Sequence, residues 1–311
     1  MADRLESCLF SEVIMFWNAL DLVCKEFLRL FDSDSHILNY KDLSVQRNKV
    51  NLHYYRPDLE DESNAAPANL GDELSLVIVK SLCKRFGIAF DETIDQTKHL
   101  FAVGSILLMG HQDATILGTG LPYSPYFSKG FTHRSFFRKL DIRCVRGPLT
   151  RKELLRLGHR CPKSFGDPAV LLPLIYQPRS VPLREVGFIP HYTKEEEMVA
   201  KVGDDAVISM RSVDYRHVID QICSCKKIVS SSLHGIILAE AYGVPVVYLQ
   251  DREDALCFKY EDWYLSTGRT SFTKAHSIAE ALTMECEPPA NIVDLQDTLL
   301  ETFPKDLWMS K

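Results

Sequence analysis

The sequence predicts an α/β protein with two Rossmann-like domains that face each other across a cleft. Strand-like and helix-like segments alternate along most of the 311 residues, and the alternation stops at a stretch of prolines and polar residues at 173–184 before it starts again. Such alternation implies right-handed crossovers and a mainly parallel sheet, and the length suits two domains. We therefore expect an N-terminal domain over residues 1–178 and a C-terminal domain over residues 179–311.

Short apolar runs that end at glycine or at polar residues mark the strands of the first domain. They lie at 49–57, 99–107, 114–121 and 142–147. Helical periodicity covers 74–87 and 149–158, and Gly158 is a helix stop signal.

The second domain repeats the alternation. The predicted strands lie at 186–192, 206–211, 227–232 and 244–250, and the helices near 194–201, 214–225 and 234–242, with one more toward the C-terminal end. Gly243 and Pro245 end the helix that begins at 234.

Composition excludes some classes of protein. Hydrophobic residues make up 46% of the chain, charged residues 25%, and the net charge is −6, which argues against a nucleic-acid binder that relies on a broad basic surface. Nine cysteines, mostly single and without the spacing of a zinc site, read as free thiols. No secretory signal is recognised at the start of the sequence, and we expect a cytoplasmic protein.

Residues 9–31 are rich in large apolar side chains but carry Glu12, Asp21, Lys25 and Glu26. These charges argue against a bilayer span and favour an amphipathic helix. Such a helix either packs on the first domain or contacts a partner or the membrane surface, and both interpretations stay open.

The turn between the strand at 227–232 and the next helix has the features of an anion site. The N-terminus of a helix presents free N–H groups and the positive end of the helix dipole. A histidine in the first turn, His234, adds a hydrogen bond or a proton, and Gly235 would let a ligand approach the backbone. In the alternative interpretation the serines only cap the helix. The candidate ligand residues here are Ser230, Ser231, Ser232, Leu233 and Gly235.

Other strand ends carry polar residues that would face the same cleft. Arg146 stands at a strand-to-helix junction, where a guanidinium suits phosphate or carboxylate. His191 follows the first strand of the second domain, and Lys259 lies on a loop or helix start. The turn that opens the helix near 74 contains Asn69, Gly71 and Asp72. For Asp167, also in a turn, we favour a structural role.

Eight segments, in this order, resemble those of the polysaccharide pyruvyltransferase family, and the resemblance runs from about residue 49 to 268. They are NLGDELS, VGSIL, ILGTGL, VRGPLTRKEL, FGDPAVLLP, GFIPHY, SSSLHGIILAEAYGVPVV and FKYEDWY. The resemblance implies a two-domain enzyme of the glycosyltransferase-B type. Such an enzyme uses phosphoenolpyruvate (PEP) to place a pyruvate ketal on a sugar of a surface polysaccharide or capsule, with no metal or other cofactor.

One position departs from the family pattern. Many relatives have arginine directly before Leu-His-Gly, where this chain has Ser232, as the exopolysaccharide succinoglycan-type branch also does. Serine cannot supply the charge, so Arg146 or Lys259 is expected to hold the anion of PEP.

The reaction that the resemblance implies needs a general acid and a general base, and the candidates are His234, Asp72 and His191. Asp72 is a candidate to accept the proton of the acceptor hydroxyl if the first domain holds the sugar, His191 is a candidate for either role, and the sequence does not divide the roles. The resemblance also implies an acceptor sugar carried on a lipid or nucleotide in the cytoplasm, and the apolar N-terminal segment could let the enzyme rest against the inner face of the membrane. Two other functions stay open. One is a glycosyltransferase that consumes a nucleotide sugar, and the other is a non-catalytic sugar-binding protein.

Overall fold

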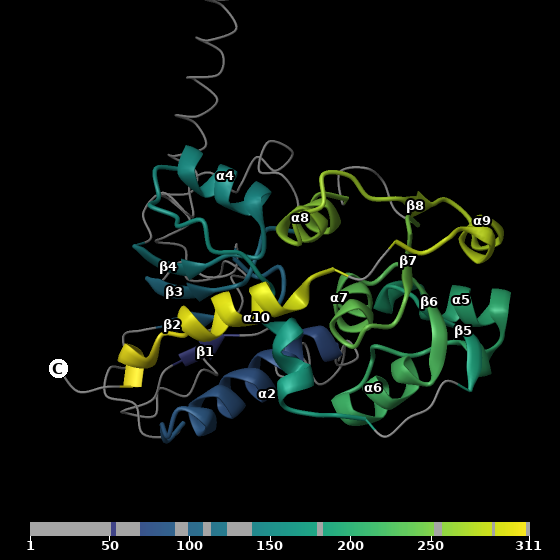
Figure 1. The fold of residues 1–311 in the computed structure, drawn as a ribbon, viewed down its shortest axis with the longest axis horizontal. Helices are drawn as coiled ribbons and strands as arrows, with labels where there is room; N and C mark the ends of the chain where they lie inside the picture. Colours follow the sequence, from purple (N-terminus) through teal and green to yellow (C-terminus); the bar gives the residue numbers. More distant parts are fainter. Residues whose placement is uncertain are drawn as a thin grey trace, which may run out of the picture.

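A computed structural model describes residues 51–53, 69–90, 99–107, 113–122, 139–178, 183–251, 257–287 and 290–308. Two parallel sheets lie side by side, with helices between and around them (Figure 1). The predicted α/β class with parallel sheets is confirmed. The amphipathic helix predicted at 9–31 lies outside the described residues.

The first sheet has the strand order β1-β2-β3-β4, and every neighbouring pair is parallel. Its strands are β1 (Asn51–His53), β2 (His99–Phe101), β3 (Ala114–Leu117) and β4 (Leu140–Cys144). All residues of β2 and β3 are buried, as expected for a parallel sheet that is covered on both faces. Each predicted strand of the first half is present, in a shorter form.

The second sheet has the order β5-β6-β7-β8, again all parallel. Its strands are β5 (Arg184–Ile189), β6 (Cys225–Ser230), β7 (Val246–Leu249) and β8 (Lys274–Ala275). Among the described strands, neither sheet shows the reversal of order that defines a doubly wound Rossmann sheet. The Rossmann-like and glycosyltransferase-B labels therefore remain predictions.

The strand predicted at 206–211 is wrong. Only Val207 forms a bridge, to Phe188 of β5, and the 3₁₀ helix η6 (Asp204–Ala206) precedes it. Beside this bridge the N–H of Ile208 donates to the carbonyl of Phe188 at 2.8 Å, and farther along the carbonyl of Met210 accepts the N–H of Leu70 at 2.8 Å. The segment thus makes a single bridge to β5 and then joins the two halves, and it does not form a full strand.

Helices pack on both sheets. The helices of the first half are α2 (Leu70–Arg85) and α4 (Pro148–Arg156), and the 3₁₀ helix η4 (Pro168–Leu174) follows them. The second half has η5 (Tyr192–Lys194), α5 (Glu195–Val202), α6 (Tyr215–Cys223), α7 (Leu233–Ala241), α8 (Phe258–Ser266) and α9 (Ile278–Thr283). Helix α7 is buried along nearly its whole length and lies between the sheets (Figure 1).

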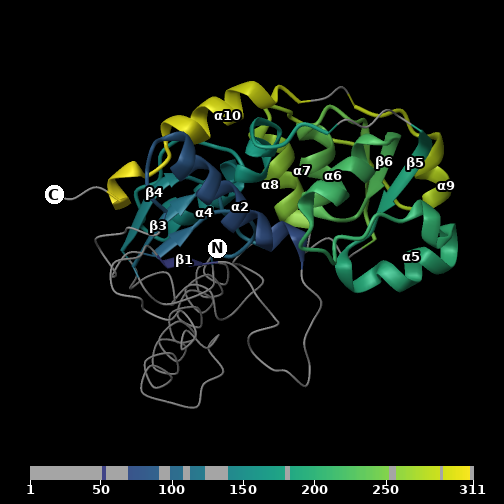
Figure 2. The same ribbon diagram turned by 90° about the horizontal axis from the view of Figure 1, so that it is seen from below.

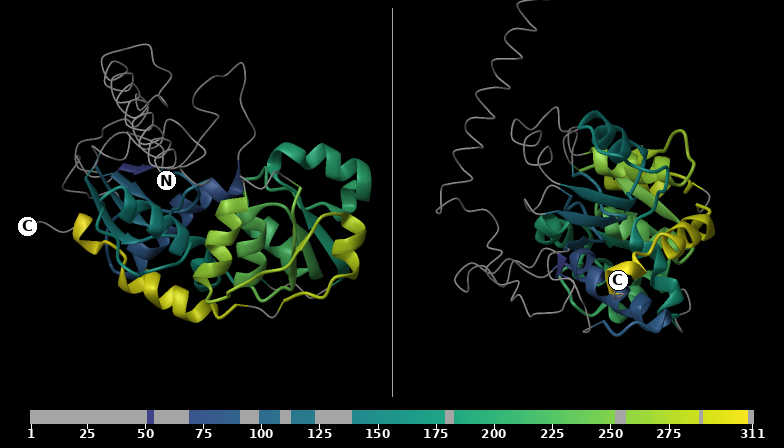
Figure 3. Two further views of the ribbon diagram at one scale, coloured as in Figure 1. Left: turned by 90° about the horizontal axis from the view of Figure 1, so that it is seen from above. Right: turned by 90° about the vertical axis from the view of Figure 1, so that its left-hand side faces the viewer.

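The C-terminal helix α10 (Ile292–Glu301) and the 3₁₀ helix η8 (Lys305–Trp308) return to the first half of the chain (Figures 2 and 3). The ring of Phe303 stacks on that of Phe86 of α2 at 5.5 Å. Arg143 of β4 pairs with Asp306 at 2.8 Å. The last residues, which the sequence assigned to the second domain, therefore contact the first half of the chain.

The two halves share one hydrophobic core. A single cluster of buried apolar residues includes Leu74 of α2, Val170 of η4 and Ile237 of α7. Further contacts cross between the halves, such as the hydrogen bond from the hydroxyl of Tyr242 to the carbonyl of Tyr176 at 2.8 Å. This shared core fixes α2 and α7, whose N-termini form the candidate site.

Candidate functional site

The N-terminus of α2 is built by the polar turn that the sequence singles out. Asn69 caps the helix, and its side-chain oxygen accepts a hydrogen bond from the N–H of Gly71 at 3.3 Å. Its amide nitrogen donates to Oδ2 of Asp72 at 2.8 Å. The cap explains why α2 begins before the apolar periodicity at 74. It also holds the buried carboxyl of Asp72 in place.

Three serines build the N-terminus of α7 in the same way. The hydroxyl of Ser232 accepts a hydrogen bond from the N–H of Gly235 at 3.3 Å, as an N-cap. The buried hydroxyl of Ser230 donates to the carbonyl of Ile189 at 3.0 Å. Ser231 accepts the N–H of His191 at 3.0 Å. The serine side chains therefore have partners inside the protein, which favours the capping interpretation for them.

Gly235 has a different role from the one expected. An ideal Cβ at this position would lie 2.6 Å from Cγ2 of Ile189 and 2.6 Å from the hydroxyl of Ser230. The space beside the glycine is filled by protein, so no ligand approaches there. Leu233 is also buried, at 3% exposure, in the shared core. The side chain of Leu233 and the Cα side of Gly235 are therefore taken up by the packing of α7.

The first turns of α2 and α7 meet at one point. An ideal Cβ on Gly71 would lie only 1.9 Å from Nδ1 of His234, so only glycine leaves room for the imidazole. The structure thereby brings together two of the predicted catalytic residues, Asp72 and His234, which are both buried. It also brings together the positive ends of two helix dipoles.

Asp167 joins this pair, although the sequence favoured a structural role for it. It does cap η4, because its Oδ1 accepts the N–H of Ala169 at 3.0 Å. Its other oxygen, Oδ2, lies 3.9 Å from Nε2 of His234, and the carboxyl is fully buried. Asp167 is thus both a cap and a member of the site, and a turn motif alone could not show the second role.

Burial shifts the pKa of each of these three side chains. It raises the pKa of Asp72 to about 7, against the smaller lowering effects of Asn69 and Lys259. It raises the pKa of Asp167 to about 6, although the Ala169 amide and Arg146 lower it. Burial, then Lys259 and Arg146, lower the pKa of His234 to about 3. At neutral pH the imidazole is therefore uncharged and Asp72 is partly protonated. Shifts of this kind cluster at functional sites.

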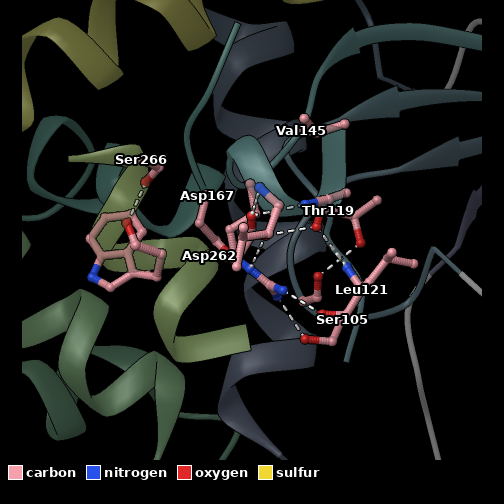
Figure 4. A network of polar contacts seen from close by, with 12 residues as sticks. Ser105, Thr119, Leu121, Val145, Asp167, Asp262 and Ser266 are labelled. Atoms are coloured by element: carbon pink, nitrogen blue, oxygen red, sulfur yellow. Dashed lines mark hydrogen bonds and ion pairs between the residues drawn. The ribbon is translucent and has the colours of Figure 1, made fainter. Parts of the chain in front are cut away.

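Arg146 does not point into an open cleft as expected. Its side chain is fully buried and lies 3.3 Å from the carboxylate of Asp262 of α8. It also donates to the hydroxyl of Ser105 at 2.7 Å and to the carbonyl of Leu121. Figure 4 shows Ser105, Leu121 and Asp262 gathered in this network. The guanidinium thus has partners in the protein, which favours a structural and electrostatic role.

Asp262 also fills the anion position at the start of α4. It accepts the N–H groups of Leu149 and Thr150 at 2.8 and 3.0 Å, and the hydroxyl of Thr150 at 2.7 Å. Helix α4 therefore has its negative partner within the chain, whereas α2 and α7 begin at the His234 cluster. From the sequence, Asp262 stands beside Lys259 on a loop or helix start, without a role of its own.

Two predicted residues stand at the edge of this cluster. Lys259, in the first turn of α8, is half-buried, and its ammonium lies 5.1 Å from the centre of the Tyr260 ring. Its charge lowers the pKa of both Asp72 and His234. His191 caps η5, and its ring contacts Thr193 and Tyr192. The backbone of His191 is linked to the site, because its N–H donates to the hydroxyl of Ser231.

A family model matches the part of the chain that carries most of this site. The polysaccharide pyruvyl transferase family model matches residues 69–250, from the cap of α2 to the end of β7. The chain belongs to this family. The resemblance noted in the sequence is therefore confirmed, and the matched region contains Asp72, Asp167 and His234. Lys259 and Asp262 lie beyond it.

Two curated relatives of the pyruvyl transferase chain cover about two thirds of its length. An uncharacterised protein of Acanthamoeba polyphaga mimivirus is 31% identical over 217 residues, 67% of this chain and 70% of that protein. The succinoglycan biosynthesis protein ExoV of Rhizobium meliloti is 30% identical over 213 residues, 65% of this chain and 62% of that protein. A crystal structure of an uncharacterised Klebsiella pneumoniae protein is 15% identical, with a TM-score of 0.46, over 77% of this chain and 97% of that chain.

Proposed function

We propose that the protein is a PEP-dependent pyruvyltransferase that forms a pyruvate ketal on a sugar of a polysaccharide or its precursor. The observation that carries the proposal is the buried group of Asp72, Asp167 and His234 at the meeting point of two helix N-termini, in a chain of the polysaccharide pyruvyl transferase family. Pyruvyl transfer from PEP needs a proton donor, a proton acceptor and a site for anions, and this group supplies all three.

The anion of PEP is proposed to lie at the N-terminus of α7. Among the hydrogen bonds of the described residues, none uses the N–H groups of Leu233 and His234. Those N–H groups and the dipole of α7 suit a phosphate or carboxylate. Lys259, whose charge acts on both Asp72 and His234, is the candidate for the cation that Ser232 cannot provide.

The reaction requires that one proton reach the methylene carbon of PEP. Protonation leaves an oxocarbenium-like centre at C2, and a sugar hydroxyl attacks that centre and loses its proton. The C2–O bond to phosphate then breaks, and a second hydroxyl attacks C2 and closes the ketal. The two hydroxyls release two protons in total. One makes up for the proton that the methylene carbon gained, and the other leaves with phosphate.

The pKa values support one assignment of the roles that the sequence left open. Asp72, with a pKa of about 7, is partly protonated at neutral pH and suits the acid that protonates the methylene carbon. His234, with a pKa of about 3, is uncharged and suits the base that accepts the hydroxyl proton. When the trianion of PEP binds nearby, its charge raises the pKa of the imidazole and favours proton uptake.

The acceptor and the place of work extend the proposal. A lipid-linked saccharide of the inner membrane face fits a polysaccharide pathway, with the segment at 9–31 as a contact to the membrane. None of the helices in the described ranges is long and apolar enough to cross a bilayer. A glycosyltransferase-B arrangement and a cytoplasmic location belong to the same proposal, with PEP as co-substrate and no metal or redox cofactor required.

Release of inorganic phosphate from PEP tests the proposal. The protein is incubated with PEP and a panel of lipid-linked or nucleotide-linked saccharides, and phosphate and the mass of the saccharide are followed. We expect phosphate release that depends on the saccharide and a mass gain equal to one pyruvate minus one water. Consumption of a nucleotide sugar without PEP would instead identify a glycosyltransferase. Binding of the saccharide without any turnover would identify a non-catalytic protein.

A further inference from the structure

Two buried polar atoms face each other inside the site, and neither makes a hydrogen bond. They are Nε2 of His234 and Oδ2 of Asp167, which lie 3.9 Å apart. Buried polar atoms in native proteins are nearly always hydrogen-bonded, so each exception needs an explanation. Here an unpaired ring nitrogen faces an unpaired carboxyl oxygen. Hydrogen bonds of catalytic groups are often long in the absence of substrate and tighten when it binds.

The surrounding protein fixes which atoms of the two side chains face each other. Oδ1 of Asp167 accepts the N–H of Ala169 at 3.0 Å, which turns Oδ2 toward the histidine. The amide of Gly104 also acts on this carboxyl and lowers its pKa. On the imidazole, Nε2 is the ring nitrogen that is buried and unpaired. The other nitrogen, Nδ1, lies over Gly71, where an added Cβ would lie 1.9 Å away. The glycine therefore keeps side-chain atoms away from Nδ1.

We propose that Asp167 is a positioning residue for His234: it accepts a hydrogen bond from Nε2–H, fixes that tautomer, and leaves Nδ1 to exchange the proton with the substrate. The inference deepens the proposed function and depends on it for the identity of the substrate. In the proton step, the sugar hydroxyl gives its proton to Nδ1 while its oxygen bonds to C2. The imidazolium then carries both protons, Asp167 stays ionised, and the proton on Nδ1 later leaves with phosphate.

The charges around the pair explain why a carboxylate is needed. Lys259 of α8 and Arg146 both disfavour a positive charge on the imidazole, and so does burial. Asp72 of α2 is partly neutral, and Asp262 of α8 is paired with Arg146. Asp167 is the remaining carboxylate that faces Nε2 directly. A buried imidazolium without such a partner would be costly to form.

Asp167→Asn separates positioning from simple packing. The amide oxygen can still accept the Ala169 N–H, so the cap of η4 is kept. The NH₂ group must then face His234 and donate to Nε2, which forces the proton of the neutral ring onto Nδ1. Turnover should fall by about 10²- to 10⁴-fold, because Nδ1 can no longer accept a proton. The Michaelis constant for PEP should change little.

¹⁵N NMR of labelled histidine, in the protein without substrate, reads the tautomer directly. The signals of His234 are assigned by their loss in His234→Gln. We expect the Nε2–H tautomer in the wild type and the Nδ1–H tautomer in Asp167→Asn. Asp214→Asn is the matched control, because Asp214 also caps a helix, α6, through its Oδ1. It should leave the His234 tautomer and turnover unchanged.

The outcomes are distinct. A wild-type ring that carries its proton on Nδ1, or an unchanged tautomer or unchanged turnover in Asp167→Asn, would overturn the positioning role. If Asp167→Asn does not fold, the wild-type tautomer still decides between support and rejection. The tautomer is measured without PEP, so it tests the positioning role even if the protein does not release phosphate. A failure to release phosphate would count against the proposed function alone.

Discussion

At the scale of single residues, His234 combines two properties that a core histidine rarely has together. It is buried with a pKa lowered to about 3, and its Nε2 lacks a hydrogen-bond partner. A histidine that served only the core would be expected to satisfy its ring nitrogens. Its position in the first turn of α7 places it where an anion would bind.

His234→Ala should therefore lower turnover by about two to four orders of magnitude, which is the usual contribution of a positioned acid or base. His234→Gln keeps a hydrogen bond but cannot transfer a proton, so it should lose nearly as much. Phosphate release measures both. Thermal unfolding is measured alongside, because a loss of activity that follows a loss of folding would make His234 a structural residue.

Asp72 carries a testable dependence of stability on pH. Its folded pKa is about 7, raised by burial from 3.8, so between these values the folded protein holds a proton that the unfolded chain has released. Stability from this group is therefore present at low pH and is lost as the pH rises toward 7. The slope is at most about 1.4 kcal/mol per pH unit.

Asp72→Asn removes the pH-dependent contribution of this carboxyl to the free energy of unfolding. Urea unfolding between pH 4.5 and 8 should show that the variant gains stability relative to the wild type as the pH rises. Burial also raises the pKa of Asp167, so the stability of the variant should still fall in part as the pH rises. Asp294→Asn, at an exposed position of α10, is the control and should follow the wild-type curve. Parallel curves for Asp72→Asn and the wild type would show that the Asp72 carboxyl is ionised in the fold.

At the scale of elements, α8 contributes two charges with opposite tasks. Asp262 is fully buried, pairs with Arg146 and caps α4. Lys259 is half-buried at the edge of the His234 group. The ion pair of Asp262 with Arg146 is expected to support folding, and Lys259 is expected to bind the anion of PEP.

The two cations should therefore respond differently to removal. Arg146→Ala leaves the Asp262 charge buried without its cation and should cost about 3–5 kcal/mol of stability. Lys259→Ala should instead raise the Michaelis constant for PEP by about ten- to a hundredfold, from the loss of a charged hydrogen bond, with little change in stability. Lys201→Ala, on the exposed face of α5, is the control. A stable Arg146→Ala protein with a raised Michaelis constant would return the anion to Arg146.

The sequence predicted most elements because their apolar periodicity is local. It missed β8 and α9, which are short, and wrongly made a strand of 206–211, whose backbone bonds to α2. The turns that carry Asp72 and His234 were found from glycine and capping signals. Asp167 and Asp262 were undervalued because their roles depend on elements far away in the chain. Contacts between residues far apart in the chain leave no pattern in the local sequence.

At the scale of the whole molecule, the return of the C-terminal segment joins the halves into one unit. Phe303 is 3% exposed and stacks on both Phe86 and Trp308. The shared core runs from α2 through η4 and α7 to these last residues. A hinge that opened the halves widely would have to break this core. Substrate entry should therefore involve loops and not separation of the halves.

Unfolding should consequently be a single transition that Phe303→Ala shifts as a whole. Loss of the ring should cost about 3–5 kcal/mol. Variants that retain only Trp263, in α8, or only Trp308, in η8, report the two halves by fluorescence during urea unfolding. We expect the two signals to coincide in the wild type and to shift together in Phe303→Ala.

The control lies in the same segment. Val293 of α10 is 59% exposed, so Val293→Ala should change stability by no more than about 0.5 kcal/mol. If the Trp308 signal of Phe303→Ala were lost at lower urea while the Trp263 transition stayed in place, the C-terminal segment would be a detachable strap. Only the local contacts of α10 and η8 would then depend on Phe303. The contact of α2 with α7 at His234 would be held by the shared core of α2, η4 and α7 without the C-terminal segment.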